Sequence, residues 1–383
     1  MRLRHLTFLL LIASALGACS DDGAADAPEP QPEPTPEAQP EAQPEAQPEA
    51  QPEAQPEPQP EVKVLEVFDN ARITSIGGME NFQNVKGEFD LGPGPFARVT
   101  LIVDLDTTCF PFEKWQQNPP PEGQNWPADC DAFDRNFEFL MDDPVDEGDP
   151  PAIELVRAIT PFGGPMHFEV DMTDIANGLP GAHTLRSHIS TWSDGAGQVS
   201  GSAGGWNVSA RIEVTEGPAP RRVLAVMPLF NGGYGHESGV VEMPYVLPEG
   251  VTETRLEYRA TGHGGGEDSS GACIGPAEEF CQRGHFLKLN GRVLSSFTPW
   301  RDDCATLCTL ERFQNFDYCK ENPTGSIQSV RAPRANWCPG SVTPPILRDP
   351  TQEAGEHRLT YQIADVVPGG SWRISALLVV FGD

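Results

Sequence analysis

The sequence predicts an all-β fold in two domains, and three observations lead to that prediction. Short stretches with alternating apolar and polar residues, or with many β-branched residues, recur between residues 97 and 382. Gly and Pro separate these stretches and account for 38 and 39 of the 383 residues. No amphipathic pattern is longer than about three helical turns. Many short strands between Gly and Pro are typical of β-sandwiches and β-barrels.

The expected strands fall into two sets on either side of a Pro-rich segment, 216–222. The first set is 97–105, 137–141, 167–172, 183–192 and 206–214. The second set is 223–230, 254–262, 285–294, 357–366 and 372–382. We therefore expect an N-terminal domain over residues 63–216 and a C-terminal domain over 220–383. A single large sandwich is the alternative.

The N-terminus has the pattern of an export signal. Two arginines precede the apolar run "LTFLLLIASAL", and "LGAC" places small residues before Cys19. We expect residues 1–18 to be a signal peptide and Cys19 to carry lipid that anchors the chain to a membrane. The expected location is the outer membrane or cell surface, with the periplasmic side possible. An ordinary signal peptide that happens to contain a cysteine is the alternative.

Residues 19–62 are expected to form a disordered tether, because the repeated unit "EAQP" contains no large apolar residue that could build a core. The formal net charge of the chain is −30. Residues 63–383 carry a net charge of −20, because twelve of the acids lie in 21–61 and two arginines precede them. Such a negative surface repels phosphate backbones, so nucleic acid is not an expected partner. We expect a monomer.

Eight cysteines follow Cys19, and an even number in an exported chain is typical of disulfides. Spacing alone leaves about 105 pairings open. A zinc site in the cluster between Cys304 and Cys338 is an alternative. The eight are Cys109, Cys130, Cys273, Cys281, Cys304, Cys308, Cys319 and Cys338.

Known catalytic and metal-binding motifs are scarce. The sequence has no G-x-S-x-G elbow, and its histidines form neither H-x-H nor H-E-x-x-H, so we expect no metal and no cofactor. Two segments place acids beside cysteines and an aromatic residue: "CDAFDR" at 130–135 and "AEEFC" at 277–281. Disulfides can hold such side chains within the tolerance that catalysis needs. Solvated turn acids in an acidic protein are the alternative interpretation.

Five motifs in order give the chain its resemblance to the bacterial peptide-N-glycosidase F family. They are "CDAFDR", "RAITPF" (157–162), "STW" (190–192), "AEEFC" and "RANWCPG" (334–340). The resemblance implies two tandem antiparallel eight-stranded jelly-roll domains with the active site where they meet. It implies metal-free hydrolysis of the amide between asparagine and the first N-acetylglucosamine of an N-glycan, with N-glycosylated proteins or glycopeptides as substrates.

The resemblance also implies roles for individual residues. Asp134 and Glu279 would be the acid/base pair, and Asp131 a supporting neighbour. The substrate-binding residues would be Arg135, Ser190, Trp192, Arg334 and Trp337. The implied disulfides are Cys109–Cys130, Cys273–Cys281, a bond from Cys338 to the Cys304 region, and a local Cys308–Cys319 bond.

One departure from the family concerns activity. Ser190 stands where the family has a glutamate, and a hydroxyl neither titrates near neutral pH nor carries a charge. Asp194 or Glu267 are candidates for a replacement acid. A glycan- or glycopeptide-binding lipoprotein without turnover is therefore the main alternative. A glycosidase using the Asp134–Glu279 pair and a copper monooxygenase on a related double jelly roll are weaker alternatives, the last because clustered His and Met ligands are missing.

Overall fold

The computed structural model describes residues 61–142, 151–265 and 273–383. Its first half holds eight strands and one short α-helix, α1 (Thr173–Gly178). The strands are β1 (Val62–Thr74), β2 (Asn84–Asp90), β3 (Phe96–Asp106), β4 (Asn136–Met141), β5 (Ile153–Ile159), β6 (Met166–Asp171), β7 (Ala182–Ile189) and β8 (Gly205–Glu216). A 3₁₀ helix, η1 (Phe112–Gln116), lies between β3 and β4.

The second half holds the remaining strands and short helices. The strands are β9 (Arg222–Gly235), β10 (Val241–Leu247), β11 (Val251–Gly264), β12 (His285–Leu289), β13 (Arg292–Phe297), β14 (Leu310–Phe313), β15 (Phe316–Cys319), β16 (Ser341–Thr343), β17 (Ile346–Arg348), β18 (Gly355–Ile363) and β19 (Gly370–Gly382). The helices are η2 (Glu278–Phe280), η3 (Cys304–Leu307) and α2 (Ile327–Arg331). No helix among the described residues is long and apolar enough to cross a membrane.

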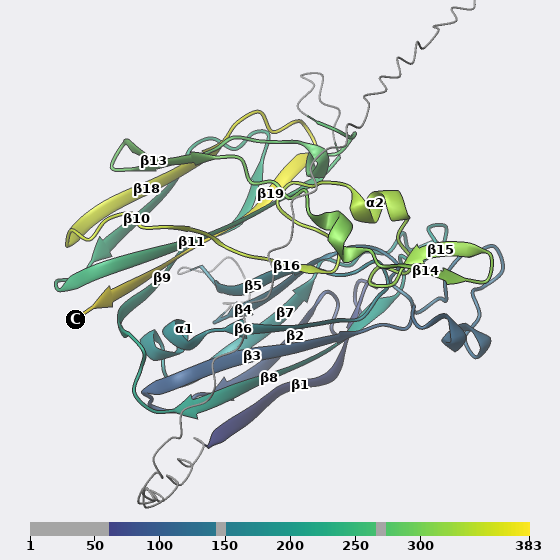
Figure 1. Cartoon of the computed structure of the whole chain (residues 1–383), viewed down its shortest axis with the longest axis horizontal. Helices are drawn as coiled ribbons and strands as arrows, with labels where there is room; N and C mark the ends of the chain where they lie inside the picture. Colours follow the sequence, from purple (N-terminus) through teal and green to yellow (C-terminus); the bar gives the residue numbers. More distant parts are fainter. Residues whose placement is uncertain (1–60, 143–150, 266–272) are drawn as a thin grey trace, which may run out of the picture. The chain divides into compact units, whose positions relative to one another are not determined.

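Both halves have the same strand order. In the first half, the sheet β1-β8-β3-β6 packs against β2-β7-β4-β5. In the second half, β9-β19-β11-β17 packs against β10-β18-β12-β13. The hairpin β14-β15 forms a separate sheet, and β16 extends the first half's second sheet beyond β5. When these three strands are left out of the numbering, both sandwiches read 1-8-3-6 over 2-7-4-5, with all strand pairs antiparallel. The two tandem eight-stranded jelly rolls are therefore confirmed, and Figure 1 shows one beside the other.

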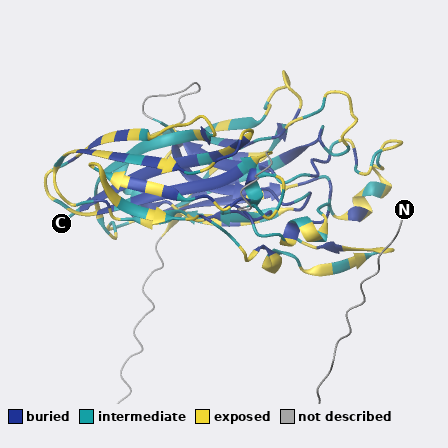
Figure 2. Ribbon diagram, turned by 90° about the horizontal axis from the view of Figure 1, so that it is seen from above, coloured by how far each residue is buried: buried dark blue, intermediate teal, exposed yellow. Residues whose placement is uncertain are grey.

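The two halves share a buried boundary made by β19 and β11. Leu377, Val379 and Phe381 of β19 join the core of the first half, whereas Leu378 and Val380 join the core of the second. Because neighbouring side chains of a strand point to opposite faces, a strand buried on both faces is apolar without interruption. Figure 2 shows the buried residues concentrated in the strands and the exposed ones in loops and at sheet edges.

One expected strand, 285–294, is two strands in the structure. Asn290 and Gly291 have φ values of 50° and 79°, so the chain makes a two-residue turn between β12 and β13. A positive φ at both central positions is the requirement of a type I′ hairpin, and Asn-Gly satisfies it. The single-strand prediction was wrong because it overlooked this turn signal.

Candidate active site

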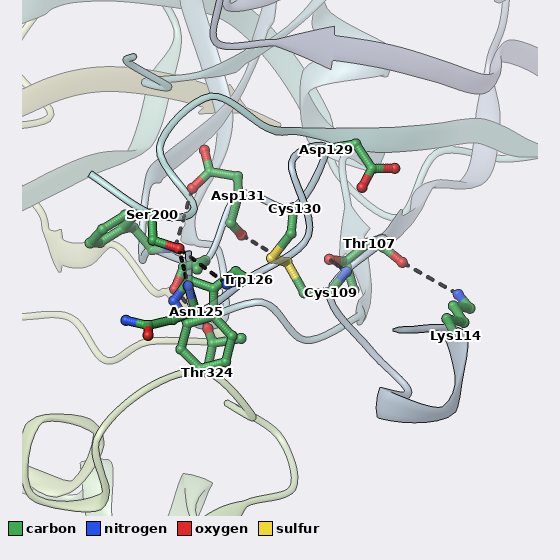
Figure 3. Close-up of a disulfide and its surroundings, with 12 residues drawn as sticks. Thr107, Cys109, Lys114, Asn125, Trp126, Asp129, Cys130, Asp131, Ser200 and Thr324 are labelled. Atoms are coloured by element: carbon green, nitrogen blue, oxygen red, sulfur yellow. Dashed lines mark hydrogen bonds between the residues drawn. A yellow bond between two sulfur atoms is a disulfide. The ribbon is translucent and has the colours of Figure 1, made fainter. Parts of the chain in front are cut away.

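Asp134 follows a turn that a disulfide and a buried ion pair hold in place. The Cys109–Cys130 bond fixes the start of the turn (Figure 3). Asp131 is fully buried, and both its carboxylate oxygens accept hydrogen bonds from Nε of Arg135 at 3.1 Å. Asp131 thus supports the loop, while the side chain of Asp134 stays 18% exposed.

Glu279 lies on η2, inside the short loop closed by the Cys273–Cys281 disulfide. Its neighbour Glu278 is fully buried and binds Arg283 through both oxygens at 2.9 and 3.0 Å. Nε1 of Trp372 also donates to Glu278 at 2.9 Å. Glu278 therefore belongs to the core of the second half. The side chain of Glu279 is 25% exposed, so Glu279 is the candidate catalytic acid of this pair.

Arg334 brings the two candidate acids together. Its Nη1 donates to Oε1 of Glu279 at 2.6 Å, and its Nη2 lies 3.9 Å from Oδ2 of Asp134. The Arg334 side chain is 1% exposed, and Ser329 accepts two further hydrogen bonds from Nη2. A buried guanidinium therefore stands between one carboxylate from each half.

Burial changes the proton affinity of both acids. It raises the pKa of Asp134, although the charges of Arg334 and Arg135 oppose that rise. It also raises the pKa of Glu279, where Arg334 lowers the value and the nearby charge of Asp134 raises it. Two close carboxyl groups with raised pKa values beside a fixed cation can hold and release a proton nearer to neutral pH than free acids do.

The two tryptophans have different surroundings. Trp192 is 43% exposed, with its ring centroid 6.2 Å from that of Phe133 and 5.4 Å from the guanidinium carbon of Arg135. Trp337 is 1% exposed, and its Nε1 donates to the carbonyl of Gly262 at 2.8 Å. The ring of Trp337 is covered, so the substrate contact that the resemblance implies for it stays a prediction. Trp192 keeps a ring that a sugar could reach.

Trp337 instead packs between charged and aromatic groups of the site. The guanidinium carbon of Arg334 lies 4.5 Å from its ring centroid, and the ring of His263 stacks on it at 5.3 Å. Burial lowers the pKa of His263 to about 3, so this imidazole is neutral. Trp337 is thus a rigid support for Arg334.

The remaining predicted residues also have defined places. Arg135 is 6% exposed and engaged by Asp131, so a direct contact with substrate stays a prediction. Ser190 is half-buried, with Oγ 3.1 Å from Nε2 of His188. Asp194 accepts four backbone hydrogen bonds from residues 196–199, which lower its pKa, so it is committed to its own loop. Glu267 and Cys19 lie outside the described residues.

A largely buried ionic network joins the two halves, and no motif in the sequence indicates it. Glu138 on β4 accepts two hydrogen bonds from Arg373 on β19, at 2.8 and 2.9 Å. Arg157 on β5 binds both oxygens of Glu154 at 2.7 Å and also donates to the hydroxyl of Thr261 on β11. The network fixes the two inner sheets relative to each other.

The disulfides among the described residues agree with the expected pairing and show that Cys338 bonds to Cys304 itself. The four bonds are Cys109–Cys130, Cys273–Cys281, Cys304–Cys338 and Cys308–Cys319. Asp303 lies beside the sulfurs of Cys304 and Cys338. The zinc alternative for this cluster is wrong, because a thiolate in a disulfide is not available as a ligand.

The chain combines a double jelly roll with a cluster of two acids and one arginine, in which each half supplies one of the acids. Residues 234–379 match the family model of peptide-N-glycosidase F, C terminal. No curated protein matches the chain by sequence.

Three solved structures share the fold. PNGF-II has 18% identity and a TM-score of 0.64, with 84% of this chain and 65% of that chain covered. A peptide-N(4)-(N-acetyl-β-D-glucosaminyl) asparagine amidase has 18% identity and a TM-score of 0.60, with 84% and 96% covered. PNGase F, a glycosylasparaginase from Flavobacterium meningosepticum, has 17% identity and a TM-score of 0.60, also with 84% and 96% covered.

The resemblance to the peptide-N-glycosidase F family is thus confirmed by the family model over the second half and by the fold over both halves. The chain spans 65% of the length of PNGF-II but 96% of the length of the other two.

Proposed function

We propose that this protein is an amidase that hydrolyses the bond between asparagine and the first N-acetylglucosamine of N-glycans. The observation that carries the proposal is the cluster in which Arg334 binds Glu279 at 2.6 Å and approaches Asp134 to 3.9 Å. Cleavage of an amide needs an activated water and a proton for the leaving nitrogen, and paired carboxyl groups can supply both.

In this mechanism Asp134 is the principal acid/base group. Its raised pKa favours a carboxyl that holds a proton and delivers it to the departing nitrogen. Glu279, held by Arg334, orients the attacking water. Trp192 offers an exposed flat ring against which a sugar can pack. The residues that carry this chemistry need no metal.

The test is release of glycan from a denatured N-glycoprotein by the purified full chain, followed by mass spectrometry of the peptide. The expected result is free glycan with conversion of the glycosylated Asn to Asp. No release at any pH between 5 and 9 would contradict the proposal, as would release of glycan with the first N-acetylglucosamine still on the asparagine.

A second candidate function is binding of glycans or glycopeptides without turnover. Ser190 favours it, because a hydroxyl stands where the family has a carboxylate and Asp194 is committed to its own loop. Binding to a glycan array with no change in the mass of a bound glycopeptide would support this candidate over the amidase.

We also propose that lipid on Cys19 tethers the protein to the outer membrane or cell surface through residues 19–62, as a monomer. Metabolic labelling with a radioactive fatty acid tests the anchor, and the variant Cys19→Ala should lose the label. Sedimentation of the detergent-solubilised chain tests the monomer.

A further inference from the structure

Asn84, His188 and Ser190 form a hydrogen-bonded series at the end of β7. Nδ1 of His188 lies 2.9 Å from Oδ1 of Asn84, and Nε2 lies 3.1 Å from Oγ of Ser190. Strand register fixes this arrangement, because Asn84 on β2 pairs directly with His188 on β7. Ser190 is two residues further along the chain, at the position where a strand places its next side chain on the same face.

The neighbours of the series determine the direction of each hydrogen bond. Nη1 of Arg186 donates to Oδ1 of Asn84 at 2.8 Å, and a guanidinium is always a donor. The Asn84 atom that faces His188 is therefore the acceptor, so Nδ1 of His188 carries the proton. In a neutral imidazole Nε2 is then the acceptor, and the hydroxyl of Ser190 donates to it. Serine, histidine and amide are thus aligned for proton transfer away from Ser190.

The series adjoins β4, the strand that begins two residues after Asp134. The backbone N–H of Ser190 donates to the carbonyl of Asn136 at 3.0 Å, and Asn136 is two residues after Asp134. Two residues further along the same two segments, His188 lies opposite Glu138. Ser190 is half-buried.

We infer that Asn84, His188 and Ser190 form a proton relay that takes the proton of the attacking water in the Asp134–Glu279 site. This inference rests on the proposed amidase function. Ser190 would contact the water, whereas His188 and Asn84 act through Ser190. In a relay of this kind, a hydroxyl whose proton passes to an imidazole takes the role of a carboxylate base.

The charges around His188 suit it to this task. Burial lowers its pKa, as do Arg186 on its own strand and Arg373 on β19, while Glu138 on β4 raises it. The imidazole is therefore neutral and able to accept a proton at neutral pH. Once it is protonated, the Glu138 carboxylate opposite stabilises the imidazolium.

Atoms and electrons are conserved in each step of the amide hydrolysis. The water oxygen forms a bond to the carbonyl carbon of the asparagine side chain, and the carbonyl electron pair moves onto its oxygen. The water proton passes to Oγ of Ser190 as the hydroxyl proton of Ser190 passes to Nε2 of His188. Collapse of the intermediate breaks the C–N bond, and Asp134 protonates the leaving glycosylamine. Solvent then carries the proton of His188 back to Asp134.

Kinetics of glycan release from an N-glycopeptide by the full chain test the relay. Ser190→Ala and His188→Gln should each lower kcat by about 100-fold with little change in KM, because general-base catalysis contributes about 10²–10⁴-fold. The double variant should be no slower than either single one, since the two residues act as a unit. Ser190→Thr, which keeps a hydroxyl, should retain most of the activity.

Two further variants separate the relay from a structural role. The double variant with Ser190→Glu and His188→Gln should recover activity. A carboxylate at position 190 can take the proton of the water itself, so it needs no imidazole as the next proton acceptor. In this double variant, the fall of the glycan-release rate at low pH should follow the protonation of a carboxylate instead of the protonation of His188. The matched control is His183→Gln, a histidine on the same strand that bonds to Asp142 at 2.8 Å, and its rate should equal that of the wild type.

The outcomes distinguish this inference from the proposed function. If the wild type releases glycan and both Ser190→Ala and His188→Gln stay within twofold of its rate, the relay is overturned and the amidase function stands. If the wild type and Ser190→Glu both release nothing, the amidase function and the relay fall together. If only Ser190→Glu releases glycan, the relay is overturned and the site is an amidase site that lacks its base.

Discussion

Glu138 and Arg373 form a buried ion pair between the two jelly rolls, with two hydrogen bonds of 2.8 and 2.9 Å between residues 235 positions apart. The side chain of Glu138 is 2% exposed and that of Arg373 is 26% exposed. Glu138 lies on β4, the strand that follows Asp134, and Arg373 lies on β19, so the pair joins the two halves.

Removing one member of this pair should destabilise the fold strongly. Arg373→Met leaves a buried carboxylate without its main partner, and we expect the free energy of unfolding to fall by about 3 kcal/mol. Chemical denaturation at pH 7 measures the change. The control is Arg312→Met, which removes an exposed pair with Asp317 and should leave the denaturation midpoint unchanged. Equal midpoints for both variants would show that the inter-half pair does not stabilise the fold.

The same pair should make stability depend on pH. Burial raises the pKa of Glu138, but the charge and hydrogen bonds of Arg373, together with Arg157, outweigh it and hold the pKa well below its usual 4.5. A folded-state pKa below the unfolded one stabilises the fold above the unfolded pKa, and this contribution is lost as pH falls. Glu138→Gln should therefore differ most from the wild type at pH 7 and progressively less below about pH 4. A difference that grows on acidification would contradict this sign.

Asp134→Asn should abolish activity and stabilise the fold. Loss of the acid/base group should lower glycan release by at least about 100-fold. Because burial raises the folded-state pKa of Asp134, loss of its proton at neutral pH is less favourable in the folded chain than in the unfolded one, and an amide of the same shape removes that cost. We expect a higher melting temperature for the variant at pH 7 and a smaller gap near pH 4. A variant that is less stable than the wild type at pH 7 would argue against a destabilising charge at this position.

Trp192→Ala should weaken substrate binding without unfolding the protein. Its ring is 43% exposed and contacts Phe133 and Arg135, so little core packing is lost. If the ring packs on a sugar, KM should rise about tenfold, which corresponds to about 1.4 kcal/mol, while kcat changes little. Trp337→Ala is the contrasting variant, because its ring is buried against Arg334 and its loss should lower stability and kcat together. An unchanged KM for Trp192→Ala would exclude the ring as a sugar platform.

The Cys109–Cys130 disulfide should contribute to both stability and catalysis. It closes a loop with a sequence separation of 21, for which chain entropy gives about 3 kcal/mol. Replacing both cysteines by Ala should lower the free energy of unfolding by about that amount and slow glycan release in the fraction that stays folded. The comparison is the Cys308–Cys319 pair, which bridges the β14–β15 hairpin, lies in neither of the loops that carry the acids, and should affect stability alone. Full activity of the Cys109/Cys130 variant would show that the turn keeps its shape without the bond.

Regular features of the fold were predictable from the sequence. β3, β4, β6, β8 and β19 were expected close to their observed bounds, because each shows alternation or a β-branched run. β5 was not identified as a strand by its pattern, since "IELVRAI" is buried on both faces and carries its charges inward to the other half. The alternation of polar and apolar residues along a strand does not indicate which of its two faces a neighbouring domain covers.

The candidate site was predictable only in part, because its geometry depends on distant contacts. Motif likeness located Asp134, Glu279 and Arg334, but only the fold shows that Arg334 lies between the acids. It also shows that Glu278, not Glu279, turns into the core. His188 and Asn84 had no sequence signal, since their partnership comes from the register of β2 against β7. Burial of Trp337 likewise depends on packing between elements far apart in sequence.

The short strand β16, Ser341–Thr343, belongs to the second half in sequence but pairs with β5 in a sheet of the first half. A chain cut after Glu216 would lose that partner and leave the edge of β5 open. An open edge strand leaves backbone N–H and C=O groups unpaired, and these can pair with another molecule. The N-terminal half alone should therefore aggregate or form strand-exchanged oligomers, and it should recover a soluble monomeric state when the C-terminal half is co-expressed in the same cell.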